Sequence, residues 1–201
     1  MLVNITEKCL EGNMFSMRAF VGIELSQSVK EGIKIIQAIV KENAHRGRYK
    51  HIDNFHITLK FLGEVSKEDI SKINEVLQNT VTKQNHFDLL IDKIGFFKGR
   101  RNIHALWLGM VRDSRHIIDL YKDIEEGLVR QSFKKDNKPY TPHITIAQDL
   151  VLKDDFENLK GKLDLDIIPS INIRSISLIK SEQIRGKRIY TPISIFRLKN
   201  L

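Results

Sequence analysis

One tripeptide occurs twice in the chain, as His56-Ile57-Thr58 and again as His143-Ile144-Thr145. Each copy lies in a segment that alternates apolar and polar residues, which is typical of a β-strand. Side chains two residues apart point to the same face of a strand, so each copy presents an imidazole and a hydroxyl group side by side. Two such strands facing each other would form a nearly symmetric site with two histidines and two threonines.

These groups suit the cleavage of a phosphodiester without a metal ion. A neutral imidazole can take a proton from water and a protonated one can give a proton to the departing oxygen, because the ordinary pKa of histidine is about 6.5. The threonine hydroxyls can donate hydrogen bonds to non-bridging phosphate oxygens. His56 and His143 are therefore the candidate acid–base pair, Thr58 and Thr145 the candidate phosphate ligands, and we expect no metal ion or cofactor.

Each part of this pattern also has a purely structural explanation. A single histidine in a strand is usually a half-buried or surface residue, and threonine is common in strands because of its propensity alone. The catalytic hypothesis depends on the combination: two copies in strands, in the same phase, one in each half of a basic chain. The other histidines receive the structural interpretation; they are His45, His51, His86, His104 and His116.

Motifs for other chemistries are missing from the sequence. It has no Walker-type phosphate loop, no dinucleotide-binding glycine fingerprint, no HExxH helix and no GxSxG elbow. It also has no cysteine–histidine cluster at zinc spacing, and its acidic residues form no pair suited to two metal ions. These patterns disfavour the common nucleotide-binding, metallohydrolase and serine-hydrolase classes.

Three basic loops could attract an RNA backbone, and such binding would weaken as salt rises. Phe97, Tyr140 and Tyr190 border these loops and are candidates for stacking on a nucleobase, whereas Trp107 alternates with two leucines and is assigned to the core. The loops contain Lys98, Arg100 and Arg101; Lys134, Lys135 and Lys138; and Arg185, Lys187 and Arg188.

Hydrophobic periodicity predicts a mixture of strands and helices. Short polar loops join several of the strands, which indicates antiparallel pairing and an α+β fold. Ser66 and Asp69 have the spacing of a capping box at the start of one helix, and Gly63 is expected to end the strand before it. We expect strands at residues 18–25, 55–62, 87–97, 103–110, 140–146, 171–179 and 189–198, and helices at 29–41, 66–77, 114–131 and 152–163.

Composition sets the remaining bounds. The chain has 201 residues, 41% of them hydrophobic, which is enough for one compact domain or two lobes with a shared core. No apolar run approaches the roughly 20 residues of a membrane span.

The formal net charge of +8 suggests a polyanionic partner, nucleic acid first. A single cysteine, Cys9, indicates a reducing, cytoplasmic compartment. Residues 1–16 lack periodicity and are expected to be a peripheral extension, with Met14 and Met17 as alternative starts.

The sequence resembles the RNA 2′,3′-cyclic phosphodiesterases, also called 2′-5′ RNA ligases, of the two-histidine phosphoesterase superfamily. The resemblance extends over residues 17–201 and is most specific in the segment HITLKFLGEV, which contains the first motif. The matching segments are MRAFVGIEL from Met17, NFHITLKFLGEV from Asn54, LWLG from Leu106 and YTPHITIA from Tyr140.

This resemblance implies a bilobal fold with pseudo-two-fold symmetry, in which two antiparallel sheets with flanking helices face each other across a cleft. It implies hydrolysis of a 2′,3′-cyclic phosphate at an RNA end to a 2′-phosphate, and possible reversal with a 5′-hydroxyl to give a 2′-5′ bond. His56 becomes the acid for the leaving 3′-oxygen and His143 the base for water. The expected partner is RNA, with no membrane, no obligate protein partner and a monomeric state.

One departure from the family pattern bears on function. Many relatives have an arginine shortly after the second motif, where this chain has Gln148. The missing charge would have to come from elsewhere, and Arg100 and Arg101 are candidates; Tyr140, Gln148 and Tyr190 are further candidate RNA contacts. Two alternatives stay open: a phosphodiesterase acting on small cyclic nucleotides such as ADP-ribose cyclic phosphate, and a protein that binds RNA ends without turnover.

Overall fold

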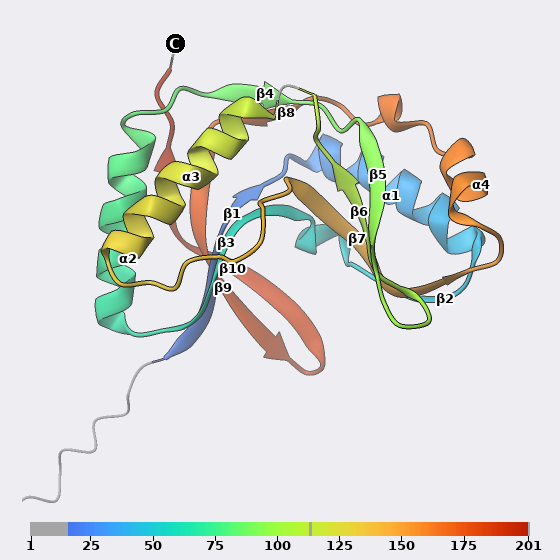
Figure 1. The fold of residues 1–201 in the computed structure, drawn as a ribbon, viewed down its shortest axis with the longest axis horizontal. Coiled ribbons are helices and arrows are strands. Elements are labelled where there is room, and N and C mark those ends of the chain that lie inside the picture. Colours follow the sequence, from blue (N-terminus) through green and yellow to red (C-terminus); the bar gives the residue numbers. More distant parts are fainter. Residues whose placement is uncertain (1–15, 113, 201) are drawn as a thin grey trace, which may run out of the picture.

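The computed structural model describes residues 16–112 and 114–200, and its centre consists of two four-stranded antiparallel sheets (Figure 1). The first, in the order β10-β9-β1-β3, contains β1 (Met17–Glu24), β3 (His56–Val65), β9 (Ser175–Ile184) and β10 (Lys187–Arg197). The second, in the order β2-β7-β6-β5, contains β2 (Ala44–Tyr49), β5 (Lys93–Lys98), β6 (Ile103–Gly109) and β7 (His143–Leu152). The α+β class and the antiparallel pairing are confirmed.

Helices flank both sheets (Figure 1). The helices α2 (Lys67–Val81) and α3 (Arg115–Arg130) lie together beside the first sheet, and α1 (Gln27–Glu42) packs on β2 and β7 of the second. A two-stranded sheet of β4 (Phe87–Leu89) and β8 (Ile171–Ile173), the short helix α4 (Phe156–Gly161), and the 3-10 turns η1 (Ile52–Asn54) and η2 (Leu165–Ile167) complete the fold. No helix within the described ranges is long and apolar enough to cross a membrane.

The two motif strands alternate as the sequence predicts. Ile57 of β3 and Ile144 of β7 are completely buried in one continuous apolar cluster. The flanking His56, Thr58 and His143 are only partly covered. Because successive side chains of a strand point to opposite faces, burial of the isoleucines forces the histidines and threonines onto the open faces of the two sheets.

The predicted start of α2 is also confirmed. The hydroxyl of Ser66 accepts a hydrogen bond from the backbone N–H of Asp69 at 3.1 Å, and the Asp69 carboxylate accepts one from the Ser66 N–H at 2.8 Å. This reciprocal capping box satisfies backbone donors that have no partner within the helix. It fixes the exit of the chain from β3 and therefore the end of the strand that carries the first motif.

The strand β2 was not predicted. Its sequence, AHRGRY, has no apolar alternation, so periodicity could not indicate it. It pairs with β7 through its backbone instead. The side-chain amide of Gln37 then donates to the carbonyls of Lys50 and Ile146, at 2.9 and 2.8 Å, which ties the strand end to helix α1.

Several expected boundaries were wrong. Gly63 does not end β3; it takes a left-handed φ of 76° and the strand continues to Val65. The expected strands 87–97 and 171–179 are each divided, because β4 and β8 pair with each other while β5 and β9 join different large sheets. The strand expected at 140–146 begins at His143 and runs to Leu152. Of the extension expected at residues 1–16, all but Ser16 lies outside the described residues.

A buried ion cluster links the first sheet to α3 and to the segment before β7. Lys60, on β3, is only 3% exposed. Its ammonium lies 2.7 Å from Glu125 and 2.9 Å from Asp136, and donates to the carbonyl of Lys134 at 2.8 Å. Glu125 also accepts a hydrogen bond from the Asp136 N–H at 2.6 Å. The cluster therefore fixes residues 134–136, close to the second motif.

We expect Lys60→Met to lower the free energy of unfolding by about 3–5 kcal/mol, because it leaves the Glu125 carboxylate buried without its counter-ion. Lys72→Met is the matched control: it removes a lysine that pairs with Glu68 on the surface of α2 and should leave stability nearly unchanged. Urea unfolding of the two variants measures the difference. Equal stabilities would show that the Lys60 cluster is not a structural link.

Candidate active site

The backbone holds the two motif histidines in the same way. Nδ1 of His56 lies 2.8 Å from the carbonyl oxygen of Asn54, and Nδ1 of His143 lies 2.8 Å from that of Thr141. A carbonyl oxygen can only accept a hydrogen bond, so Nδ1 must carry the proton in each ring. In the neutral imidazole this leaves Nε2 unprotonated and able to accept a proton.

Each histidine also rests on aromatic rings. The ring of Phe20 lies 4.7 Å from that of His56, and Tyr190 meets His56 edge-on at 4.9 Å. Trp107 lies 6.0 Å from the ring of His143, and Phe97 meets His143 edge-on at 5.4 Å. This repeated packing restricts the rotation of both imidazoles and removes water from one side of each.

Burial lowers the pKa of both histidines. It is the largest cause of the fall for His56, to about 4, which the positive charges of Lys50, His143 and Lys30 reinforce. Burial is also the main reason why the pKa of His143 lies below its ordinary value. Both imidazoles are therefore mainly neutral at pH 7 in the unliganded protein.

Thr58 forms hydrogen bonds with both His56 and Tyr140. Its hydroxyl lies 3.0 Å from Nε2 of His56, and because that nitrogen is the acceptor of the neutral ring, the hydroxyl donates. The Thr58 carbonyl accepts a hydrogen bond from the Tyr140 hydroxyl at 3.1 Å. Tyr140 in turn stacks on Tyr121, with ring centroids 4.2 Å apart. Tyr140 thus positions the first motif from the segment that leads into the second.

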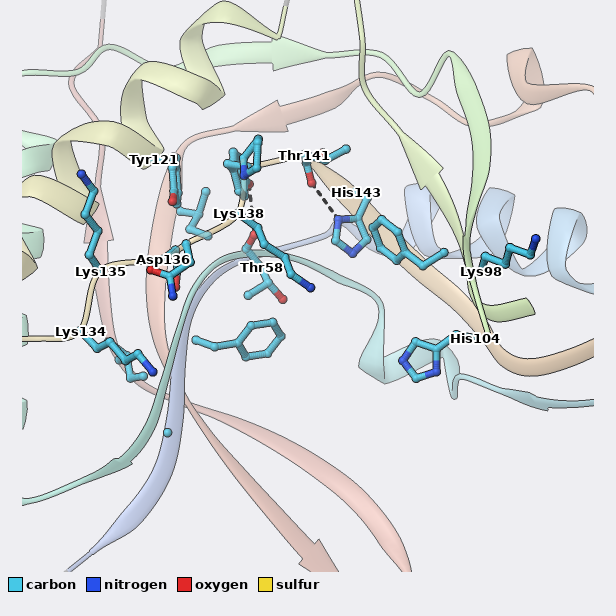
Figure 2. Close-up of a pocket in the computed structure, with 18 residues that line it drawn as sticks. Thr58, Lys98, His104, Tyr121, Lys134, Lys135, Asp136, Lys138, Thr141 and His143 are labelled. Carbon is cyan, nitrogen blue, oxygen red and sulfur yellow. Dashed lines mark hydrogen bonds between the residues drawn. The ribbon is translucent and has the colours of Figure 1, made fainter. Parts of the chain in front are cut away.

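A groove of about 860 Å³ runs past this site (Figure 2). Thr58 and His143 lie between its two arms: one arm leads to Lys134 and Lys135, and the other to Lys98 and His104. Of the predicted site residues that the structure describes, Thr145, Gln148 and Tyr190 do not line this groove. The predicted residues that do line it are Thr58, Tyr140 and His143, with Phe97, Lys98, Lys134, Lys135 and Lys138 from the predicted basic loops and their borders. His56 does not line the groove; it lines a separate small cavity with Phe20 and Tyr190, and its Nε2 contacts the hydroxyl of Thr58.

The two motif strands share an irregularity at the same place. Gly22 on β1 pairs with Thr58 and Val21 pairs with Lys60, so Leu59 is an extra residue in β3. Likewise Trp107 on β6 pairs with Thr145 and Leu106 pairs with Ala147, so Ile146 is extra in β7.

These bulges give the third residue after each threonine an equivalent place. Phe61 pairs with Phe20, and Gln148 pairs with Ala105. Cross-strand partners point to the same face of a sheet, so Phe61 lies on the face of Phe20 and His56, and Gln148 on the face of Trp107 and His143. Gln148 therefore shares a sheet face with His143, although it is not among the residues that line the groove.

Arg100 and Arg101 are exposed in the loop between β5 and β6, outside the residues that line the groove. The positive charges that act on His56 come instead from Lys50 and Lys30. Sequence reasoning missed both lysines, because Lys50 follows the unpredicted strand β2 and Lys30 lies in a helix with no motif. It also missed Phe20 and the carbonyls that orient the imidazoles.

These groups can hold and transfer protons at two nitrogen atoms beside hydroxyl donors. In the described ranges, no three His, Cys, Asp or Glu side chains gather as a metal site would require. The chemistry available to the two histidines themselves is the transfer of protons.

Similarity to known proteins identifies the family of this chain. Residues 26–185 match the model of the 2′-5′ RNA ligase superfamily. The chain is 28% identical over 184 residues to the RNA 2′,3′-cyclic phosphodiesterase of Methanothermobacter thermautotrophicus, covering 90% of this chain and 99% of the relative. It is 30% identical over 186 residues to the protein of that name from Escherichia coli strain K12, covering 90% and 96%.

Among solved structures, the crystal structure of E. coli LigT complexed with 3′-AMP superposes with a TM-score of 0.75 at 28% identity, covering 92% of this chain and 99% of that one. The family match spans most of the sequence, and the fold agrees with it. The chain belongs to the 2′-5′ RNA ligase superfamily.

Proposed function

We propose that this protein hydrolyses 2′,3′-cyclic phosphate ends of RNA to 2′-phosphates by metal-independent acid–base catalysis with His56 and His143. The observation that carries the proposal is the matched pair of half-buried imidazoles, each oriented by a carbonyl on Nδ1 and each basic at Nε2. The names of the relatives, RNA 2′,3′-cyclic phosphodiesterases, support the choice of substrate.

In this reaction a water oxygen attacks phosphorus and the bond from phosphorus to the 3′-oxygen breaks. His143 takes the proton from water, and His56 gives a proton to the leaving 3′-oxygen, in the roles that the family resemblance implies. The Thr58 hydroxyl turns from Nε2 of His56 to a phosphate oxygen, which frees that nitrogen, and Thr145 holds the phosphate from the other strand. With a 5′-hydroxyl in place of water, the same displacement forms a 2′-5′ bond, and its reversal regenerates the cyclic phosphate.

The low pKa of His56 constrains this assignment. An acid must carry a proton, whereas His56 is neutral at pH 7 before substrate binds. The phosphodiester anion raises the pKa of a nearby imidazole, because an opposite charge stabilises the protonated form. Substrate binding thus supplies the shift that His56 needs. Lys50 and Lys30 attract the anion in place of the arginine that Gln148 replaces.

His56→Ala and His143→Ala should each lower kcat/KM for a short RNA with a 2′,3′-cyclic phosphate end by about 10²–10⁴-fold, the usual contribution of a general acid or base. The wild type should keep its activity in EDTA. His45→Ala, at an exposed histidine of β2, is the control and should be fully active. Tight RNA binding by a folded wild type without product would instead support the binding-only alternative.

The profile of kcat/KM against pH should be bell-shaped, with its optimum below pH 6.5. Activity should fall near pH 4 on the acid side and at a pKa below 6.5 on the alkaline side, and the two limbs belong to the interacting pair of His56 and His143 rather than to one residue each. Initial rates between pH 3.5 and 9 measure both limbs. An optimum at pH 8 would contradict the lowered pKa values.

A substrate with sulfur in place of the 3′-oxygen separates the two roles, because a thiolate leaves without protonation. We expect this substrate to restore most of the activity of His56→Ala and little of that of His143→Ala. The ratio of rates on the sulfur and oxygen substrates is the measured quantity. Selective rescue of His143→Ala would reverse the assignment.

A further inference from the structure

We propose that the arm of the groove formed by Phe61 and residues 134–138 binds the RNA nucleotides immediately upstream of the cyclic-phosphate end. This inference rests on the proposed function and makes it more specific, since it predicts that the enzyme prefers oligonucleotides to mononucleotides. Residues 134–138 are called the lysine loop below.

A 2′,3′-cyclic phosphate is the last group of an RNA strand. All upstream nucleotides must therefore extend away from the catalytic groups in one direction. The groove offers two directions from Thr58 and His143 (Figure 2). In the arm toward β5, Phe97 is already packed against Trp107 and His143. The arm along the lysine loop has both the larger number of lysines and a more exposed aromatic side chain.

The charge of this arm suits a phosphate backbone. The lysine loop supplies Lys134, Lys135 and Lys138, all exposed and all lining the groove. Asp136 is the one acidic side chain among the described residues of the lining, and the buried Lys60 ammonium pairs with it. The arm therefore presents three lysines with little opposing charge, as binding of a single-stranded polyanion requires.

The backbone of the lysine loop is fixed rather than free to follow any ligand. Lys60 binds the carbonyl of Lys134 and the carboxylate of Asp136, and Glu125 binds the N–H of Asp136. At the other end of the segment, the Tyr140 hydroxyl binds the Thr58 carbonyl. These contacts connect the loop directly to the first motif strand, so its lysines keep a set place relative to the catalytic groups.

Phe61 provides a surface for a base. Its side chain is 69% exposed although it lies in the middle of a strand, and it lines the groove. The bulge at Leu59 turns it to the face that carries Thr58. At the equivalent place in the second motif strand stands Gln148, which has no ring. An aromatic ring at only one of these two equivalent places gives the nearly symmetric site a direction, because a base can stack on Phe61 but not on Gln148.

The test compares two substrates that share the same reacting group: a nucleoside 2′,3′-cyclic phosphate and a hexanucleotide ending in that group. The variants are the triple Lys134→Ala/Lys135→Ala/Lys138→Ala, which leaves the backbone contacts of the loop in place, and Phe61→Leu, which keeps an apolar side chain without the ring. The control is Lys34→Ala/Lys41→Ala/Lys153→Ala, which removes the same charge from exposed residues outside the groove lining. Binding of a hexanucleotide 2′-phosphate is measured in parallel by fluorescence anisotropy.

We expect the wild type to prefer the hexanucleotide. Phe61→Leu should lower kcat/KM for it by about tenfold, while the mononucleotide rate changes little. The lysine-loop triple variant should weaken hexanucleotide binding and reduce the slope of log Kd against log salt by about 2, close to 0.7 for each lost phosphate contact on a single strand. The control variant should match the wild type in substrate preference.

The proposed binding site would be overturned if the lysine-loop and control variants weakened hexanucleotide binding equally. It would also be overturned if Phe61→Leu lowered kcat/KM equally for the hexanucleotide and the mononucleotide. Failure of the underlying function gives a different result, namely no turnover of either substrate by the wild type. Fluorescence anisotropy still tests hexanucleotide binding to the lysine-loop arm in that case, because binding does not depend on catalysis.

Discussion

The structure depends on one constraint, that two strands must each bury one face in a shared core. Ile57 and Ile144 belong to the same apolar cluster, and their burial fixes the register of β3 and β7. A slip of one residue would turn both isoleucines into solvent and both histidines into the core. The bulge that follows each threonine then redirects the next residues, turning Phe61 and Gln148 to the open side. Packing and catalysis therefore use opposite faces of the same strands.

The site combines half-buried imidazoles with nearby positive charge. Burial keeps His56 and His143 neutral, and Lys50 and Lys30 oppose protonation of His56 further. In the proposed reaction, an arriving phosphodiester anion relieves this repulsion and raises the pKa of the imidazoles. In the Lys60 cluster, by contrast, the charges are paired with each other within the protein, and they position the lysine loop.

Much of this could be predicted from the sequence, and the failures have physical reasons. The motif strands, the capping box of α2 and the α+β class follow from local periodicity and spacing. The strand β2 could not be found, because its edge pairing to β7 uses backbone groups and leaves no apolar pattern in Ala44–Tyr49. Lys50, whose charge acts on His56, directly follows this strand. Arg100 and Arg101 are basic and near an aromatic residue in sequence, but only the fold reveals that their hairpin tip lies outside the groove lining.

The central claim is that His56 and His143 form a pair of neutral imidazoles, each basic at Nε2, whose protonation the phosphate controls. Nitrogen-15 NMR of labelled histidine side chains, titrated with and without a nucleoside 2′-phosphate, tests this most directly. The account predicts that both rings carry their proton on Nδ1 at pH 7, that both titrate below 6.5, and that the ligand raises both pKa values. A ring that is protonated on Nε2 in its neutral form, or a pair of pKa values unmoved by the ligand, would contradict it.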